Sequence, residues 1–204
     1  MAETAIKIEI FRKKTLEEFS LLLSDPNSRL ESGSGSAAVG AFAGSLLLRA
    51  ANLISESDER KEELEWYVRN AEILRSYLIN LVDEDVKCRA PLIRAEKKGD
   101  EQRIEASRQT SVSICLEIIN MMGKCLEMAS ALLLYADEQA ASYLRESAEF
   151  AYAAALSASE FVLTTSALST DDTYRYVIKR ENELTMQEQK ELLDRILSGL
   201  KSGN

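Results

Sequence analysis

The chain has 204 residues, 46% of them apolar and 29% charged, which is typical of one soluble globular domain with a sizeable core. The net charge of −9 argues against nucleic acid or an anionic membrane as a partner, because both require a basic surface. Histidine is absent, which excludes Ser–His–Asp and Cys–His catalysis and the usual zinc sites.

The sequence predicts a cytoplasmic protein. Residues 1–10 carry charges and lack the apolar segment of a signal peptide. The apolar run at 37–48 is shorter than the roughly 20 residues that cross a bilayer. The cysteines, Cys88, Cys115 and Cys125, have no CxxC spacing and are expected to be buried, reduced thiols.

Two prolines and eight glycines in a chain rich in Ala, Leu, Glu and Ser predict an all-α fold. A capping box of Thr15 and Glu18 begins a short helix, which ends at the turn 25–28. Small residues at 32–36 then lead into a helix that ends near 55–58. The longest helix is expected over 59–95.

After a turn with Gly99 as its C-cap, a helix is expected over 101–136, followed by one over 138–165. A further helical segment runs from 169–172 to about 183, and a second capping box, Thr185 with Glu188, opens the last helix through 200. The prediction is one domain over 1–204, a helical bundle of about six to seven helices whose long members are antiparallel because their connections are short.

The stretch of small residues at 32–52 is the most distinctive part of the sequence. Ser36, Gly40 and Gly44 recur every four residues and so share one helical face, where another backbone can approach closely. The Gly/Ser segment before it meets a helix N-terminus, which suits an anion. A flexible loop followed by an ordinary core helix is the alternative interpretation. A seam of alanines in the helix 138–165 would complement the small-residue face, and together they predict a dimer.

Asp85 is the candidate for chemistry. The helix 59–95 has a buried stripe with steps of three and four residues, and Asp85 is its one acidic member, while Asp83 and Glu84 fall off it and are expected to be solvated. Burial raises the pKa of a carboxyl group toward the range useful for a general base or acid. The alternative is a structural ion pair with Arg108, which lies on the apolar face of the next helix. Arg108 could instead clamp a substrate carboxylate.

Together these features resemble the cyclodeaminase domain of formiminotransferase-cyclodeaminase and the related methenyltetrahydrofolate cyclohydrolases, from about residue 15 to 172. The family's PGGGS-type loop matches the positions Ser32, Gly33, Ser34, Gly35 and Ser36. Its VDxDAEAF segment matches residues 82–89, and its second Asp, the catalytic carboxylate of the family, falls on Asp85.

Other family positions match in part. A downstream Arg of the family matches Arg108, and the Ser of its GN…SD segment matches Ser142. The two Asn residues of its NVxIN segment are replaced here by Phe161 and Thr165, and the acidic residue that follows is kept as Asp171.

The resemblance implies an all-α homodimer that binds a folate near the Gly/Ser segment, with a tetrahydrofolate derivative as substrate and with no metal or further cofactor. The expected reaction is hydrolysis of 5,10-methenyltetrahydrofolate to 10-formyltetrahydrofolate, with Asp85 as general base. Residues 32–36 would hold the glutamate carboxylate or a pterin edge of the folate, and Arg108 and Ser142 would also bind it. The alternatives are release of ammonia from 5-formiminotetrahydrofolate, or a non-catalytic helical dimer that kept the fold and lost the site.

Overall fold

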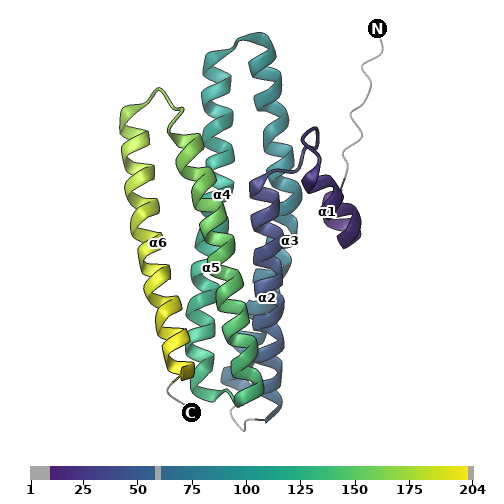
Figure 1. Ribbon diagram of the computed structural model, residues 1–204, viewed down its shortest axis with the longest axis vertical. Coiled ribbons are helices and arrows are strands. Elements are labelled where there is room, and N and C mark those ends of the chain that lie inside the picture. The colour runs from purple at the N-terminus through teal and green to yellow at the C-terminus, as the bar shows by residue number, and fades with distance from the viewer. Residues whose placement is uncertain (1–9, 58–60, 202–204) are drawn as a thin grey trace.

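Short connections fold the long helices back on one another in an up-and-down bundle (Figure 1). The structure, a computed structural model, describes residues 10–57 and 61–201. The helices are η1 (Phe11–Lys13), α1 (Leu16–Ser24), α2 (Ser32–Ser57), α3 (Lys61–Lys98), α4 (Glu101–Leu132), η2 (Leu133–Tyr135), α5 (Glu138–Ser166) and α6 (Asp172–Lys201). Helices α2 to α5 form the central bundle, and α6 packs on α4 and α5. The predicted all-α bundle is confirmed, and the described residues contain no strand.

The ends of most helices agree with the sequence prediction. The capping box forms, with the Glu18 N–H donating to the Thr15 hydroxyl and the Glu18 carboxylate accepting from the Thr15 N–H. Gly99 has a φ of +66°, which is the left-handed conformation expected of a helix C-cap. The predicted end of α4 at residue 136 is a few residues too late, because the chain tightens into the 3₁₀ turn η2 after Leu132.

Two expectations about helix boundaries are wrong. Residues 32–36 are the first turn of α2 and not a loop. Residues 172–201 form one helix, so the Thr185–Glu188 pattern caps nothing. The buried side chains of α6, Asn182, Gln189, Leu193 and Ile196, continue the same face across residue 185, and packing of that face keeps the helix unbroken.

The buried stripe of α3 is confirmed, and one neighbouring prediction is wrong. Its positions are buried or half-buried: Leu64, Tyr67, Ala71, Leu74, Leu78, Leu81, Asp85, Cys88, Leu92 and Ala95. Asp83, expected to be solvated, is 4% exposed. Its carboxylate accepts from the Phe11 and Arg12 N–H groups at 2.7 and 3.2 Å and pairs with the Arg12 side chain at 3.3 Å, so it ties η1 to α3.

The small-residue face of α2 packs within the chain. A Cβ on Gly40 would lie 3.1 Å from the sulfur of Met122 in α4 and 3.2 Å from Leu78 in α3. One on Gly44 would lie 3.1 Å from the Cα of Arg75, so this face lies against α3 and α4. The alanine seam of α5, Ala148, Ala151, Ala155 and Ala158, is also fully buried. Helix α5 meets another part of α2, where the Ser147 hydroxyl donates to the Ala43 carbonyl at 2.8 Å. The small-residue face of α2 and the alanine seam of α5 are therefore both buried within one chain. By themselves they are not evidence for a dimer.

Two segments are long and apolar enough to pass a composition test for membrane helices. They are Ser32–Glu56 and Glu101–Tyr135. The apolar run 37–48 is too short to cross a bilayer, but the whole of helix α2 that contains it is long enough. The share of each tested window that is buried inside the bundle is 50% and 44%. Burial of this extent is what core helices of a bundle require.

Candidate functional site

The side chain of Asp85 lies where the first turn of α2 crosses α3. Its Oδ2 accepts two hydrogen bonds from one residue, from the Ser34 N–H at 2.8 Å and from the Ser34 hydroxyl at 2.7 Å. Asp85 is 7% exposed and Ser34 is fully buried. The Ser34 hydroxyl also lies 3.2 Å from the Val82 carbonyl, one turn before Asp85 on α3. The predicted inward orientation of Asp85 is confirmed.

Gly33 makes this close crossing possible. A Cβ at this position would lie 2.3 Å from Oδ1 of Asp85 and 2.6 Å from its Cγ, well inside van der Waals contact. Glycine costs about 1 kcal/mol relative to alanine within a helix. Glycine is needed at position 33 because the Asp85 carboxylate occupies the space that a side chain would fill.

The anion predicted at this helix N-terminus is the protein's own carboxylate. The N–H of Ser34 is one of the groups at the start of α2 that have no partner within the helix, and it is taken by Asp85. The other small residues face elsewhere: Gly35 lies toward Leu23 of α1, and the Ser36 hydroxyl donates to the Ser32 carbonyl. Within this chain the segment positions Asp85, and the expectation that residues 32–36 hold the glutamate carboxylate or a pterin edge of a folate stays a prediction.

Burial is the main influence on the ionisation of Asp85. It raises the pKa of the carboxyl group above its ordinary value, and the two hydrogen bonds from Ser34 partly oppose that rise. The charge of Asp85 in turn helps to raise the pKa of the Cys115 and Cys88 thiols, although burial is the larger cause for both. These cysteines are unpaired thiols, and their raised pKa disfavours the thiolate form that nucleophilic catalysis needs. The ionisable group suited to proton transfer is thus Asp85.

A cavity of about 170 Å³ lies beside Asp85, between the ends of α3, α4 and α5. Its lining combines acidic, basic and apolar side chains: Glu31, Asp85, Arg89, Leu92, Glu96, Arg108, Ser111, Phe161, Thr165 and Leu168. A second hollow of about 460 Å³ lies beside the turn after α1 and shares Glu31 and Phe161 with the first. Ser32 lines this second hollow. The two spaces are therefore neighbours on either side of Glu31 and Phe161.

Arg108 lines the cavity but does not pair with Asp85. Its Nη1 donates to the Leu168 carbonyl at 3.3 Å, and within the described residues it has no carboxylate partner. Of the two interpretations of Arg108, the ion pair with Asp85 is wrong. Its guanidinium therefore has donors to spare beside the cavity, which a ligand carboxylate could accept.

The cavity also contains an ion pair between residues that are not among the predicted site residues. Arg89 pairs with Glu31, the residue just before α2, and both residues line the cavity. Arg89 lies four residues after Asp85, on the same face of α3. That spacing was a signal available in the sequence, whereas the position of Glu31 depends on how α2 crosses α3.

Ser142 lies away from this cluster. It is in the second turn of α5, whereas the α5 residues that line the cavity, Phe161 and Thr165, lie near the other end of the helix. The 19 residues from Ser142 to Phe161 correspond to roughly 28 Å of helix. Ser142 therefore does not line the cavity beside Asp85 of its own chain, and its role in substrate binding stays a prediction.

The two substituted family positions lie inside the site. Phe161 and Thr165 replace the Asn residues expected from the family pattern, and both line the cavity beside Asp85. Phe161 supplies no hydrogen-bonding side chain, and Thr165 supplies a hydroxyl. Neither position therefore offers the amide group of an Asn side chain to the cavity.

Comparisons with known proteins agree with this architecture. The sequence model of the formiminotransferase-cyclodeaminase family matches residues 15–183. The fold is similar to the crystal structure of formiminotetrahydrofolate cyclodeaminase from Thermotoga maritima, with a TM-score of 0.86 and 20% identity, over 93% of this chain and 97% of that one. A comparison with curated proteins finds no match. At this identity the structural likeness establishes the shared fold.

Proposed function

Because this chain belongs to the formiminotransferase-cyclodeaminase family, we propose that it acts on a one-carbon derivative of tetrahydrofolate and releases ammonia from 5-formiminotetrahydrofolate. The observation that carries the proposal is the buried carboxylate of Asp85, held by Ser34 at the edge of a cavity. The resemblance in the sequence alone predicts hydrolysis of the methenyl derivative. The family match and the activity of the Thermotoga maritima relative favour the deaminase instead.

The proposed reaction needs one group that accepts a proton and then returns it. The nitrogen at position 10 of the folate attacks the formimino carbon, a C–N bond forms, and Asp85 accepts the proton from that nitrogen. Asp85 then donates the proton to the amino group, whose C–N bond breaks and which leaves as ammonia. The formimino group enters the reaction protonated, as an amidinium cation, and the products are the 5,10-methenyl cation and neutral ammonia, so charge and atoms balance. The raised pKa of Asp85 suits a carboxyl that must both accept and donate a proton.

The size of the cavity limits which part of the folate can enter it. Small-molecule sites usually measure about 300–1,000 Å³, and the cavity beside Asp85 measures about 170 Å³. We place the reacting one-carbon group in this cavity and the rest of the folate along the adjoining hollow of about 460 Å³. Arg108 is the candidate partner for a carboxylate or carbonyl of the ligand.

An assay with both substrates tests the proposal. The purified protein should convert 5-formiminotetrahydrofolate to the methenyl product, with one ammonia released per methenyl group formed. Ammonia is measured by a coupled assay and the methenyl group by its near-ultraviolet absorbance. Loss of added methenyltetrahydrofolate without ammonia release from the formimino substrate would support the hydrolase instead. Turnover of neither substrate would leave the non-catalytic alternative.

The substituted cavity positions favour one second candidate, a relative that binds folate weakly or without turnover. If Phe161 and Thr165 weaken recognition, the double variant Phe161→Asn, Thr165→Asn should bind the folate about tenfold or more tightly, since each restored hydrogen bond contributes about 1 kcal/mol. Isothermal titration calorimetry measures the affinity. The matched control is Thr164→Asn, because Thr164 is exposed and does not line the cavity. Equal affinity in the wild type and the double variant would contradict the assigned role of these positions.

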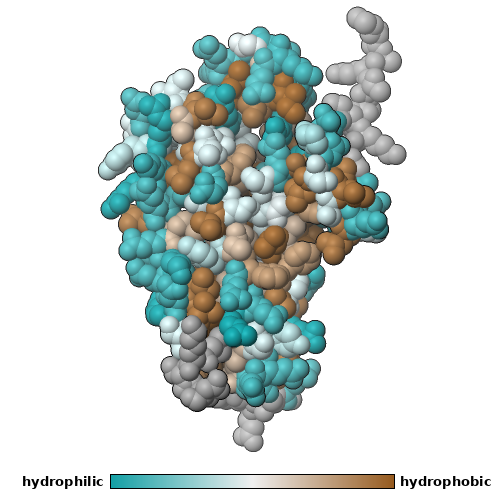
Figure 2. All heavy atoms as spheres, viewed as in Figure 1, coloured by the Kyte–Doolittle hydropathy of each residue, from teal (hydrophilic) through white to brown (hydrophobic). Residues whose placement is uncertain are grey.

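We also propose that the chain forms a homodimer through the face made by α2 and α5. The two helices lie side by side, and Phe42 of α2 and Phe150 and Leu156 of α5 are 43–48% exposed. Figure 2, viewed from the same side as Figure 1, shows mainly weakly polar and apolar side chains over the middle of this face. Such a surface is typical of a protein interface.

The dimer is tested by light scattering. The wild type should have the mass of two chains, and the variant Phe42→Glu, Leu156→Glu should have the mass of one, because the charges would be buried at the interface. Ile73→Glu is the control, since Ile73 is 64% exposed on α3 and outside the proposed interface. A monomeric wild type would contradict the proposal.

A further inference from the structure

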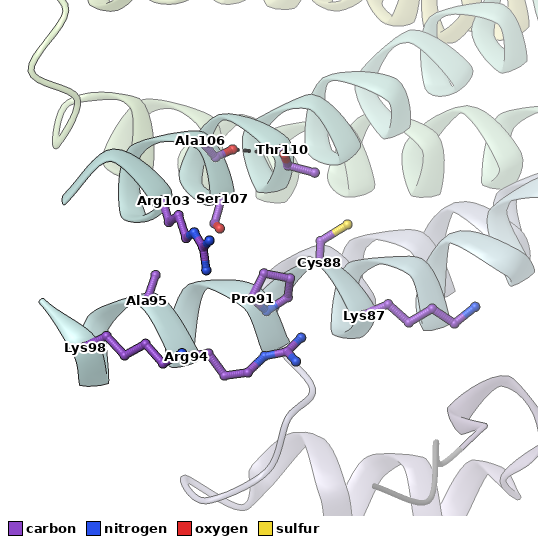
Figure 3. Close-up of a pocket in the computed structure, with 10 residues that line it drawn as sticks. All are labelled: Lys87, Cys88, Pro91, Arg94, Ala95, Lys98, Arg103, Ala106, Ser107 and Thr110. Atoms are coloured by element: carbon purple, nitrogen blue, oxygen red, sulfur yellow. Dashed lines mark hydrogen bonds between the residues drawn. The ribbon is translucent and has the colours of Figure 1, made fainter. Parts of the chain in front are cut away.

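A larger cavity, of about 550 Å³, lies on the other side of the contact between α3 and α4 (Figure 3). Its lining residues are Lys87, Cys88, Pro91, Arg94, Ala95, Lys98, Arg103, Ala106, Ser107 and Thr110. They come from α3 and α4 alone, whereas the site beside Asp85 also includes residues of α5 and the segment before α2. The two cavities share no lining residue, so this second space is separate from the proposed folate site.

The charge of this cavity is opposite to that of the protein. Four of its lining residues are cations and none is an acid, in a chain of net charge −9. Lys87 pairs with Glu84 at 2.6 Å and Arg103 with Asp100 at 3.2 Å, both outside the cavity lining. Among the described residues, neither Arg94 nor Lys98 pairs with a carboxylate. Figure 3 shows the Arg103 side chain extending into the space between the two helices.

Ser107 adds a hydroxyl donor to the lining of this cavity. It is 9% exposed, and no partner within the described residues hydrogen-bonds to its hydroxyl. In Figure 3 this oxygen points into the space between α3 and α4. The hydroxyl is thus placed to bond to a molecule that enters the cavity.

We propose that this cavity binds a small organic phosphate. Guanidinium groups form paired hydrogen bonds with phosphate oxygens, and Arg94 and Arg103 supply two of them at the edge of the cavity. Pro91, Ala95 and Ala106 supply an apolar surface for the organic part of the ligand. Ser107 donates to a phosphate oxygen. This site does not depend on the proposed reaction at Asp85.

Calorimetric titration with ADP and with pyrophosphate tests the proposal at physiological salt. ADP should bind with one site per chain and a dissociation constant in the micromolar range. Pyrophosphate should bind about tenfold or more weakly, because it lacks the apolar contact. Equal affinity for the two would overturn the organic part of the proposal, and no saturable binding of either up to millimolar concentration would overturn all of it.

Two variants locate the binding. Arg94→Ala, Arg103→Ala should weaken ADP binding about tenfold or more. The control Arg69→Ala, Lys190→Ala changes the net charge equally but lies outside the cavity, and it should bind ADP nearly as the wild type does. Ser107→Ala keeps the charge and should weaken binding several-fold. Equal losses in the arginine variant and the control would show unspecific attraction and overturn the site. Asp85→Asn should bind ADP normally, which separates this result from the folate assay.

Discussion

Replacing Asp85 by Asn is expected to reduce ammonia release from 5-formiminotetrahydrofolate by about 10²–10⁴-fold, because the amide can neither accept nor return the proton. Asn keeps an oxygen that can accept the hydrogen bonds of Ser34. Steady-state assays at saturating substrate measure the loss. Glu84→Gln is the matched control, because Glu84 is the residue before Asp85 and its substitution removes the same charge. The Glu84 side chain is exposed and pairs with Lys87. An Asp85→Asn variant with the wild-type rate would refute the role of Asp85 as proton carrier.

Stability separates a chemical role of Asp85 from a structural one. Burial raises the pKa of this carboxyl, so the folded state holds its proton more tightly than the unfolded state does. Its contribution to the free energy of unfolding is therefore fully present below the ordinary pKa and is lost as the pH rises through the raised value. Asp85→Asn removes this loss and should unfold at an equal or higher denaturant concentration than the wild type at neutral pH. A large loss of stability would instead indicate a structural role.

The same pKa determines the pH dependence of the reaction. Asp85 must be ionised to accept the proton, so the rate should rise with pH through the raised pKa of the group. Ser34→Ala removes a hydrogen bond that lowers this pKa, and the rising limb should then move to higher pH. Profiles of kcat/KM against pH measure the shift. A shift to lower pH would contradict the role of Ser34.

Replacing Gly33 by Ala is expected to destabilise the fold by about 1–3 kcal/mol and to abolish most of the activity. The added Cβ would lie 2.3 Å from Oδ1 of Asp85, so either the carboxylate or the start of α2 must move. Both movements break the hydrogen bonds between Ser34 and Asp85. Urea unfolding and the ammonia assay measure the two effects.

Gly35→Ala is the matched control, two residues away in the same turn of α2. Its added Cβ would meet Leu23 at 3.7 Å, which is ordinary contact. Alanine should therefore be tolerated there and could stabilise the helix by up to about 1 kcal/mol. Equal stability and activity in the two alanine variants would show that the close approach of Gly33 to Asp85 is not needed.

Positions that depend on the regular spacing of a helix could be predicted from the sequence. The stripe of α3 placed Asp85 inward, and the capping box placed the start of α1, because both depend on residues within one turn of each other. The resemblance identified the family, and it marked Phe161 and Thr165 as departures from the family pattern. The prediction that Asp83 is solvated is wrong because η1, 72 residues earlier in the chain, covers this side chain. Helical spacing carries no information about such a distant neighbour.

The sequence by itself thus determined the helical bundle and the acidic side chain that faces its interior, since both follow from local periodicity. Only the tertiary structure decided what that side chain contacts. In the folded chain the Ser34 N–H donates to Asp85, and Arg108 donates to the Leu168 carbonyl and not to Asp85. Ser142 lies at the other end of α5 from the cavity. The physical reason is that the crossing of α2 over α3 depends on close packing between segments about 50 residues apart. Periodicity within one helix carries no information about such a crossing.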